Sequence, residues 1–271
     1  MDEIYDVMIL GAGASGLTAG IYSARAQLNT IILNEGAVGG QMVLTNEIAN
    51  YPGVETTKGY VLAGIMKKQS RDFGCTIKSN IKISKYNLDD KIKNVVLEDG
   101  REIRAKSVIL APGGKPRPLD IPGENEFKGT GISYCATCDG EFFTDKEIIV
   151  VGGGNSALEE AVTLSRYASK ITIVHQFDNF QAFEHAIQET EANPKIEFMH
   201  ESQLRSFRGN GVLESVSIEH LPTGQISEKK INGVFIFAGY LPNTSSLKGI
   251  VPLNERNEII VDQDMKTDMP G

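Results

Sequence analysis

Cysteine is scarce in this sequence, with only three residues in a chain of 271. So few thiols cannot build the disulfide framework that stabilises small secreted domains. Low cysteine usage is instead typical of proteins that work in a reducing compartment. The sequence therefore predicts a cytoplasmic location.

Positive charge and long apolar runs are lacking as well. Lys and Arg total 27 against 35 Asp and Glu, a net charge of −8, and no basic run offsets this balance. A protein that binds nucleic acid through bulk positive charge is therefore disfavoured. No apolar stretch approaches the length of a membrane-spanning helix, and the acidic first residues lack the basic region of a signal peptide. We expect no nucleic-acid partner, no membrane partner and no cleaved leader.

A strand, a glycine turn, a helix and a second strand follow one another at the start of the chain. Residues 6–10 are interpreted as a strand whose apolar run is continuous from Val7, as in a parallel strand that is buried on both faces. The turn Gly-Ala-Gly-Ala-Ser-Gly occupies 11–16, and apolar residues then recur at helical spacing up to Leu28. Residues 30–33 form the second strand. This segment therefore predicts a βαβ unit.

The same pattern returns in the middle of the chain. A strand at 147–151 leads into Gly-Gly-Gly-Asn-Ser-Ala at 152–157, a helical stripe follows, and a strand at 171–174 completes the unit. Two such units in a chain of this length predict an α/β protein with two doubly wound domains of the nucleotide-binding type.

Two stretches rich in proline and glycine mark the expected domain boundaries. The first, at 112–118, follows a buried strand at 107–111, and the second, at 239–243, follows a strand at 233–238. We therefore expect the second domain to be inserted into the first. The first domain would comprise 1–113 and 244–271, and the inserted domain 114–243. Alternating or charged stretches at 82–104 and 212–230 are typical of small antiparallel sheets.

The first glycine turn has the spacing of a pyrophosphate-binding turn. Its glycines let backbone N–H groups at a helix N-terminus approach the phosphates, which a Cβ atom would block. Asn34 and Glu35 end the next strand, where a carboxylate could accept a hydrogen bond from a ribose hydroxyl. Because Asn34 occupies the position where the acidic residue is expected, the ribose partner stays open. The structural alternative is a turn that serves only tight helix–strand packing.

The second glycine turn lacks these partners. The strand after it ends in His-Gln-Phe-Asp-Asn-Phe-Gln at 175–181, with no Asp or Glu directly at the strand end and no Arg for a 2′-phosphate. A phosphate dianion beside Gln and Phe gains no charge-assisted hydrogen bond. A nucleotide-type fold that no longer binds a nucleotide well therefore stands beside the binding interpretation.

Cys135 and Cys138 form a C-x-x-C pair that is followed by Asp139. Two thiols at this spacing can close and reopen a small disulfide ring, one sulfur attacking a partner and the other resolving the product. Zinc needs about four ligands, and the remaining Cys75 and the four histidines show no second paired spacing, so we expect no metal. Asp139 could move a proton to or from a thiolate, or could simply cap the turn. Cys75 is interpreted as a lone buried residue.

The chain resembles the low-molecular-weight thioredoxin reductases over essentially its whole length. The motifs that carry the resemblance are Gly-Gly-Gln at 39–41, Asn-Tyr-Pro-Gly at 50–53, Cys-Ala-Thr-Cys-Asp at 135–139, the two glycine turns, and Gly-Tyr-Leu-Pro-Asn-Thr at 239–244. The resemblance implies a homodimer whose first domain binds FAD and whose inserted domain is of the NAD(P)H type. It also implies that Cys138 faces the flavin, that Cys135 attacks the disulfide of thioredoxin, and that Asp139 is the acid/base.

The same resemblance implies a set of flavin contacts in the first domain. They are Gly11, Gly13, Ala14, Ser15, Gly16, Asn34, Glu35, Gly40, Gln41, Asn50, Ala111 and Gly113.

The chain departs from the family pattern at three places. The NADPH signature H-R-R-x-x-x-R has Gln176, Phe177 and Gln181 at its arginine positions, and a small branch of the family with this feature takes electrons from ferredoxin instead. Pro112 replaces a threonine and removes a hydroxyl and an N–H donor. Members of the family continue past the position that corresponds to Gly271 with a segment whose aspartate binds the flavin. Either more chain follows here, or the flavin site is incomplete.

Three functions follow from these observations. The first is an FAD enzyme that reduces thioredoxin through Cys135 and Cys138, with ferredoxin as the electron donor and NADPH doubtful as a cofactor. The second is an ordinary NADPH-dependent thioredoxin reductase whose phosphate is held by other residues, such as Arg166 or Lys170. The third is a flavin- or partner-binding module without turnover.

Overall fold

The computed structural model describes residues 3–44 and 48–271, so residues 1, 2 and 45–47 of the expected first domain lie outside the described residues. The chain divides into two compact units. Unit 1 comprises Met1–Lys115 and Leu241–Gly271, and unit 2 comprises Pro116–Tyr240. The sequence predicted that the chain passes between the two domains at 113/114 and at 243/244. Strands at the crossings, β7 (Gly114–Pro116) and β16 (Tyr240–Pro242), pair in a two-stranded sheet.

Unit 1 is built on a six-stranded sheet of order β3-β2-β1-β6-β5-β4. β1, β2, β3 and β6 are mutually parallel, whereas β4 and β5 are antiparallel additions next to β6. The strands are β1 (Ile4–Leu10), β2 (Thr30–Leu33), β3 (Thr76–Lys78), β4 (Ile83–Asn87), β5 (Lys93–Leu97) and β6 (Glu102–Leu110). The helices are α1 (Ala14–Arg25), α2 (Gly59–Asp72) and the 3₁₀ turns η1 (Gly40–Leu44) and η3 (Ser245–Leu247).

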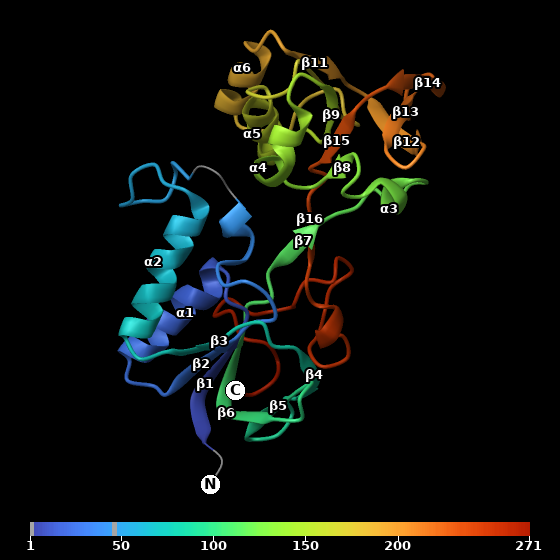
Figure 1. Cartoon of the computed structure of the whole chain (residues 1–271). Helices are drawn as coiled ribbons and strands as arrows, with labels where there is room; N and C mark the ends of the chain where they lie inside the picture. Colours follow the sequence, from blue (N-terminus) through green and yellow to red (C-terminus); the bar gives the residue numbers. More distant parts are fainter. Residues whose placement is uncertain (1–2, 45–47) are drawn as a thin grey trace. The chain divides into compact units, whose positions relative to one another are not determined.

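The last four residues of β1, residues 7–10, are all apolar because both faces of this part of the strand are buried. Val7 and Ile9 pack with residues of α1 and α2, the two helices that run together beside the sheet (Figure 1). Met8 and Leu10 point to the opposite cluster, with residues of β2, β5 and β6. Alternate side chains of one strand thus serve two cores, which is the pattern of a covered parallel strand.

One expectation about unit 1 needs correction. The stretch 82–104 does not form a sheet of its own, because β6 begins at Glu102 and pairs along one edge with β5 and along the other with β1. The antiparallel ribbon therefore extends the main sheet. Residues 212–230, in contrast, do contribute to a separate three-stranded sheet of order β12-β13-β14.

Unit 2 has a five-stranded parallel sheet of order β11-β10-β9-β15-β8. Its strands are β8 (Ile132–Ser133), β9 (Glu147–Val151), β10 (Lys170–Val174), β11 (Ile196–Met199) and β15 (Gly233–Ile236). The antiparallel sheet consists of β12 (Ser202–Gly209), β13 (Leu213–His220) and β14 (Gln225–Lys230). The helices are α3 (Glu124–Phe127), α4 (Ala136–Asp139), α5 (Asn155–Leu164), α6 (Glu184–Glu191) and the 3₁₀ turn η2 (Gly140–Phe143).

The parallel sheet of unit 2 is covered on both faces. Ile148 and Val150 of β9 pack into one cluster with residues of α5 and α6, whereas Ile149 and Val151 pack into another with residues of β12 and β13. Figure 1 shows these helices and the antiparallel sheet on opposite sides of β9. Both units therefore have the predicted α/β architecture with a glycine turn after the central strand. Over the described residues, no helix has the length and apolar character needed to cross a bilayer.

Candidate functional site

The first glycine turn joins β1 to α1. Gly11 has a φ of +111°, and a Cβ there would lie 2.0 Å from the carbonyl oxygen of Ala111. A Cβ on Gly16 would lie 2.0 Å from the carbonyl oxygen of Gly11. These two glycines are therefore required by packing alone, because side chains would separate the helix from the strands.

Gly13 has a different reason to be glycine. A Cβ there would have only the Cα of Gly40 in reach, at 4.0 Å, so packing does not exclude a side chain. Gly13 is the N-cap of α1 and makes no side-chain capping hydrogen bond, and the first N–H groups of a helix have no acceptor within it. The bare backbone therefore leaves these donors available to an anion, which is the arrangement that binds pyrophosphate.

A cavity of about 660 Å³ opens in front of this turn, within unit 1. All of the predicted flavin contacts except Gly16 and Asn50 line it. Gly16 is buried behind the turn, and Asn50 is exposed outside the cavity. Asn243, which belongs to the 239–244 motif, also lines the cavity, and residues that the sequence did not single out complete the lining, including Ile83, Tyr86, Ser245, Ser246 and Leu247.

Asn34 and Glu35 have separate roles. Asn34 Oδ1 accepts from the N–H of Ala12 at 2.9 Å, and Nδ2 donates to the carbonyl of Gly36 at 2.6 Å. The Asn34 amide is thus engaged in holding the turn. Glu35 is exposed and lines the cavity, so its carboxylate is the acceptor available for a ribose hydroxyl. Burial, reinforced by the charge of Glu35, raises the pKa of nearby Tyr86.

Asn243 lies just after β16 and is hydrogen-bonded to the backbone that follows β6. Its Nδ2 donates to the carbonyl of Pro112 at 3.2 Å, and its N–H donates to the carbonyl of Gly113 at 3.0 Å. The Gly-Tyr-Leu-Pro-Asn motif pointed to a hinge but not to this contact, because more than a hundred residues separate the partners in sequence. Asn243 thereby fixes the backbone beside the predicted contacts Ala111 and Gly113.

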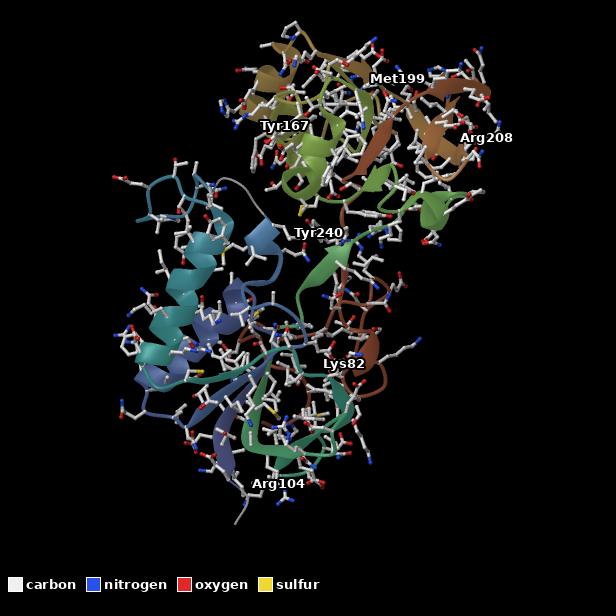
Figure 2. All side chains as sticks on the ribbon, viewed as in Figure 1. Lys82, Arg104, Tyr167, Met199, Arg208 and Tyr240 are labelled. Atoms are coloured by element: carbon white, nitrogen blue, oxygen red, sulfur yellow. A yellow bond between two sulfur atoms is a disulfide. The ribbon has the colours of Figure 1, made fainter. Side chains whose placement is uncertain are left out.

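The cysteine pair lies at the start of α4 in unit 2. Cys135 and Cys138 are joined by a disulfide with their Cα atoms 5.4 Å apart (a yellow bond in Figure 2). Cys135 is the N-cap, and its Sγ accepts from the N–H of Cys138 at 3.2 Å. Cys138 is exposed, whereas Cys135 is half-buried. The part of the chain that the structure describes contains no group of three or more His, Cys, Asp or Glu side chains suited to a metal ion.

Packing behind α4 positions the pair. A Cβ on Gly140 would lie 3.2 Å from atoms of Leu164 and of Tyr167, the latter labelled in Figure 2. The glycine therefore lets the short helix sit closely against the end of α5. The remaining cysteine, Cys75, is buried in the core of unit 1, and burial raises the pKa of its thiol.

Asp139 is held by a serine that the sequence did not single out. Ser133 Oγ donates to Asp139 Oδ2 at 2.6 Å and accepts from the N–H of Cys135 at 3.0 Å. Ser133 and Asp139 both line a cavity of about 420 Å³ that also includes Lys146 and Asn232. A hydroxyl two residues before the first cysteine was the only sequence signal for this contact. The site thus combines a disulfide, a carboxylate and a buried hydroxyl.

Comparisons with known proteins agree with this combination of folds and redox pair. The family model described as pyridine nucleotide-disulphide oxidoreductase matches residues 5–271. A thioredoxin reductase of Peptoclostridium acidaminophilum is 43% identical over 278 residues, which cover 100% of this chain and 88% of that protein. The chain belongs to the thioredoxin reductase family of pyridine nucleotide-disulphide oxidoreductases.

Further relatives of this disulphide oxidoreductase extend the match. The thioredoxin reductase of Bacillus subtilis is 39% identical over 273 residues, which cover 100% of this chain and 85% of that protein. Among solved structures, thioredoxin reductase from Lactococcus lactis superposes with a TM-score of 0.95 at 38% identity, covering 98% of this chain and 88% of that one. The fold and the family predicted from the motifs are thereby confirmed.

The second glycine turn of this thioredoxin reductase family member also faces a cavity. It has a volume of about 740 Å³ and lies within unit 2, and its lining includes the turn itself and the three departures from the NADPH signature, Gln176, Phe177 and Gln181. His175, at the end of β10, is buried and stacks on Phe180 with ring centroids 5.7 Å apart. Burial lowers the pKa of His175, and its Nε2 lies 3.1 Å from the carbonyl oxygen of Asn179.

The cations that line this cavity are not those that the sequence suggested. Arg166 and Lys170 are absent from the lining, and Lys170 pairs with Glu197 at 2.8 Å. Arg117 and Arg205 do line the cavity. Arg205 is paired with the carboxylate of Glu219, whereas Arg117 makes no ion pair among the residues that the structure describes.

Proposed function

We propose that this protein is an FAD-dependent enzyme that reduces the disulfide of thioredoxin through Cys135 and Cys138. The disulfide beside Asp139 is the observation that carries the proposal. The cavity in unit 1 fits FAD because the N–H groups of the first turn of α1 suit a pyrophosphate and Glu35 suits a ribose. Bound FAD would supply the two electrons that the disulfide needs.

The cysteines carry these electrons to thioredoxin in balanced steps. Two electrons and two protons convert the disulfide to two thiols. Asp139 takes the proton of the Cys135 thiol, the resulting thiolate attacks one sulfur of the thioredoxin disulfide, and the leaving thiolate takes that proton from Asp139. Asp139 next takes the proton of the Cys138 thiol, and the Cys138 thiolate attacks the Cys135 sulfur of the mixed disulfide. This step restores the Cys135–Cys138 bond, and the second thioredoxin thiolate leaves with the proton from Asp139.

The geometry supports Cys135 as the attacking thiol. Its sulfur accepts the N–H of Cys138 at 3.2 Å, and such a donor stabilises a thiolate more than a thiol. Cys138 would then be the residue that faces the flavin. Asp139 would act as the proton donor and acceptor for both thiols.

We propose ferredoxin, rather than NADPH, as the electron donor. The cavity at the second turn has Gln176, Phe177 and Gln181 where a 2′-phosphate would need cations. Arg205 is already compensated by Glu219, so it offers little net charge to a dianion. A one-electron donor that reduces the flavin directly does not need this cavity.

NADPH dependence is kept as the second candidate because of Arg117. Its side chain is exposed at the same cavity and makes no ion pair among the described residues. A single guanidinium could still bind one phosphate group.

An anaerobic titration of the FAD-loaded protein with reduced ferredoxin, NADPH and NADH in parallel tests the donor. We expect the flavin absorbance to bleach with ferredoxin and to remain with either nicotinamide. Rapid and complete bleaching at micromolar NADPH would overturn the ferredoxin proposal and favour the second candidate.

A cysteine comparison tests the reaction itself. Cys138→Ser should abolish thioredoxin reduction, whereas Cys75→Ser, which removes a buried thiol in the core of unit 1, should retain it. Thioredoxin reduction by the Cys138→Ser variant at the normal rate would contradict the proposed function.

We further propose that the protein forms a homodimer and that it is located in the cytoplasm. Val61 and Ile65 are exposed one turn apart on α2, and Tyr22 is exposed on α1. Exposed apolar side chains on neighbouring helices are typical of an association surface. Sedimentation of the purified protein should give twice the monomer mass, and Ile65→Glu should shift it toward the monomer.

A further inference from the structure

Ser133 is a buried hydroxyl between the redox pair and the carboxylate beside it. It ends β8, where it pairs with Phe235 of β15, and the residue is only 4% exposed. Its Oγ lies 2.6 Å from Asp139 Oδ2, 3.0 Å from the nitrogen of Cys135 and 3.2 Å from the carbonyl oxygen of Cys135. Among the described residues, no other side chain is hydrogen-bonded to Asp139.

A hydroxyl can serve Asp139 in both of its protonation states. When Asp139 is ionised, Ser133 donates to the carboxylate and accepts the N–H of Cys135. When Asp139 is protonated, it donates to Ser133, whose own proton turns to the Cys135 carbonyl. One donor and two acceptor positions are enough for either arrangement. No buried polar group loses its partner when the proton moves.

We propose that Ser133 is a positioning residue for the reaction, which keeps Asp139 directed at the cysteine pair throughout the proton transfer. This inference rests on the proposed function, in which Asp139 is the acid/base. Ser133 contacts neither substrate nor cofactor in this role and acts only through Asp139 and the backbone of Cys135.

Other charged groups near Asp139 have their own contacts. Lys146 lines the same cavity, and its Nζ donates to the carbonyl of Phe142 at 2.8 Å and lies 5.5 Å from the centre of the Phe143 ring. Glu141 follows in η2 and is exposed. Ser133 is therefore the neutral hydrogen-bonding partner of Asp139 within this set.

The pH dependence of ferredoxin- or dithionite-driven thioredoxin reduction by the full-length FAD enzyme tests the proposal. Without the hydroxyl, the ionised carboxyl loses a charge-assisted hydrogen bond and the protonated carboxyl loses a weaker neutral one, so the ionised form is disfavoured more. In Ser133→Ala we expect the alkaline limb of the pH–kcat profile to move up by about one pH unit, the difference between a charge-assisted and a neutral hydrogen bond. We also expect kcat to fall about tenfold at the optimum while KM for thioredoxin stays unchanged.

Two variants control for structural effects. Ser133→Thr keeps the hydroxyl and should restore the wild-type profile. Ser215→Ala removes a buried serine that donates to Glu228 at 2.6 Å in the antiparallel sheet, a contact of the same kind away from α4, and should leave the profile unchanged. Thermal melting establishes that each variant is folded. Thiol titration before and after reduction establishes that its cysteine pair is intact.

A double-mutant cycle separates this inference from the proposed function. Because Ser133 acts through Asp139, Ser133→Ala should change nothing further in an Asp139→Asn background. An unshifted profile in Ser133→Ala, or an equal loss of kcat in both backgrounds, would overturn the positioning role while leaving the proposed function intact. Normal turnover by Asp139→Asn alone would instead overturn the acid/base role on which the inference rests.

Discussion

The imidazole of His175 occupies the space into which a side chain on Gly153 would extend. A Cβ at Gly153 would lie 2.4 Å from Nδ1 of the ring. The middle glycine of the second turn is therefore explained by contact with a buried histidine and not by the approach of a phosphate. Gly154 is different, because the atom nearest to a Cβ added there would lie 3.8 Å away.

This contact predicts an unequal response to alanine at adjacent glycines. Gly153→Ala should lower the free energy of unfolding by about 1–3 kcal/mol, because the methyl group displaces His175 from its stack with Phe180. Gly154→Ala should have less effect, since its site is open. Thermal and denaturant unfolding of the two variants measure the difference. Equal melting curves for both would contradict the packing explanation.

Glu160 gives the protein a stability that depends on pH between about 4.5 and 7. Burial, helped by the charge of Glu159, raises its pKa to about 7, compared with 4.5 in the unfolded chain. The folded state thus favours the neutral acid, so the contribution to stability is complete below pH 4.5 and is lost as the pH rises through 7.

Glu160→Gln should therefore stabilise the protein at pH 8 by roughly 2 kcal/mol and have little effect at pH 4.5. Denaturant unfolding at the two pH values measures this, with Glu191→Gln on the exposed face of α6 as the matched control. A difference that is the same at both pH values would exclude the titration of Glu160 as its cause.

Replacements at the end of β2 should separate cofactor binding from folding. Glu35→Ala should weaken FAD binding about tenfold, the loss of one hydrogen bond from a ribose hydroxyl to a charged group, and should melt like the parent. Asn34→Ala should lower the melting temperature as well, because it removes the bonds to Ala12 and Gly36. Glu55→Ala, an exposed carboxylate outside the cavity lining, is the control for charge. FAD fluorescence titration and thermal melting distinguish the cases.

Restoring cations at the second cavity should create a response to NADPH. In the triple variant Gln176→Arg, Phe177→Arg and Gln181→Arg, the NADPH concentration that half-reduces the flavin should fall at least about tenfold relative to the parent. The response to NADH should not change, since NADH has no 2′-phosphate. A parent that NADPH reduces as readily as the triple variant would show that Arg117 or another group already binds the phosphate.

Local patterns in the sequence were enough for the architecture. The glycine turns and the C-x-x-C pair each lie within one supersecondary unit, so spacing alone predicts a βαβ fold twice and a redox pair. The antiparallel stretch at 82–104 was misjudged as a sheet of its own, because only tertiary pairing lets β6 join both β5 and β1. Roles that depend on a distant partner, as for Asn243 and Pro112, were outside the reach of spacing.

The sequence by itself determined the fold class, the family and the two sulfurs, since these follow from contiguous residues whose spacing fixes a turn or a small ring. The tertiary structure decided which neighbour each polar group has. It engaged Asn34 in holding the turn and left Glu35 facing the cavity, placed Arg205 rather than Lys170 at the second cavity, and set Ser133 against Asp139. Hydrogen bonds and ion pairs require atoms within a few ångströms, and folding alone brings distant parts of the chain that close.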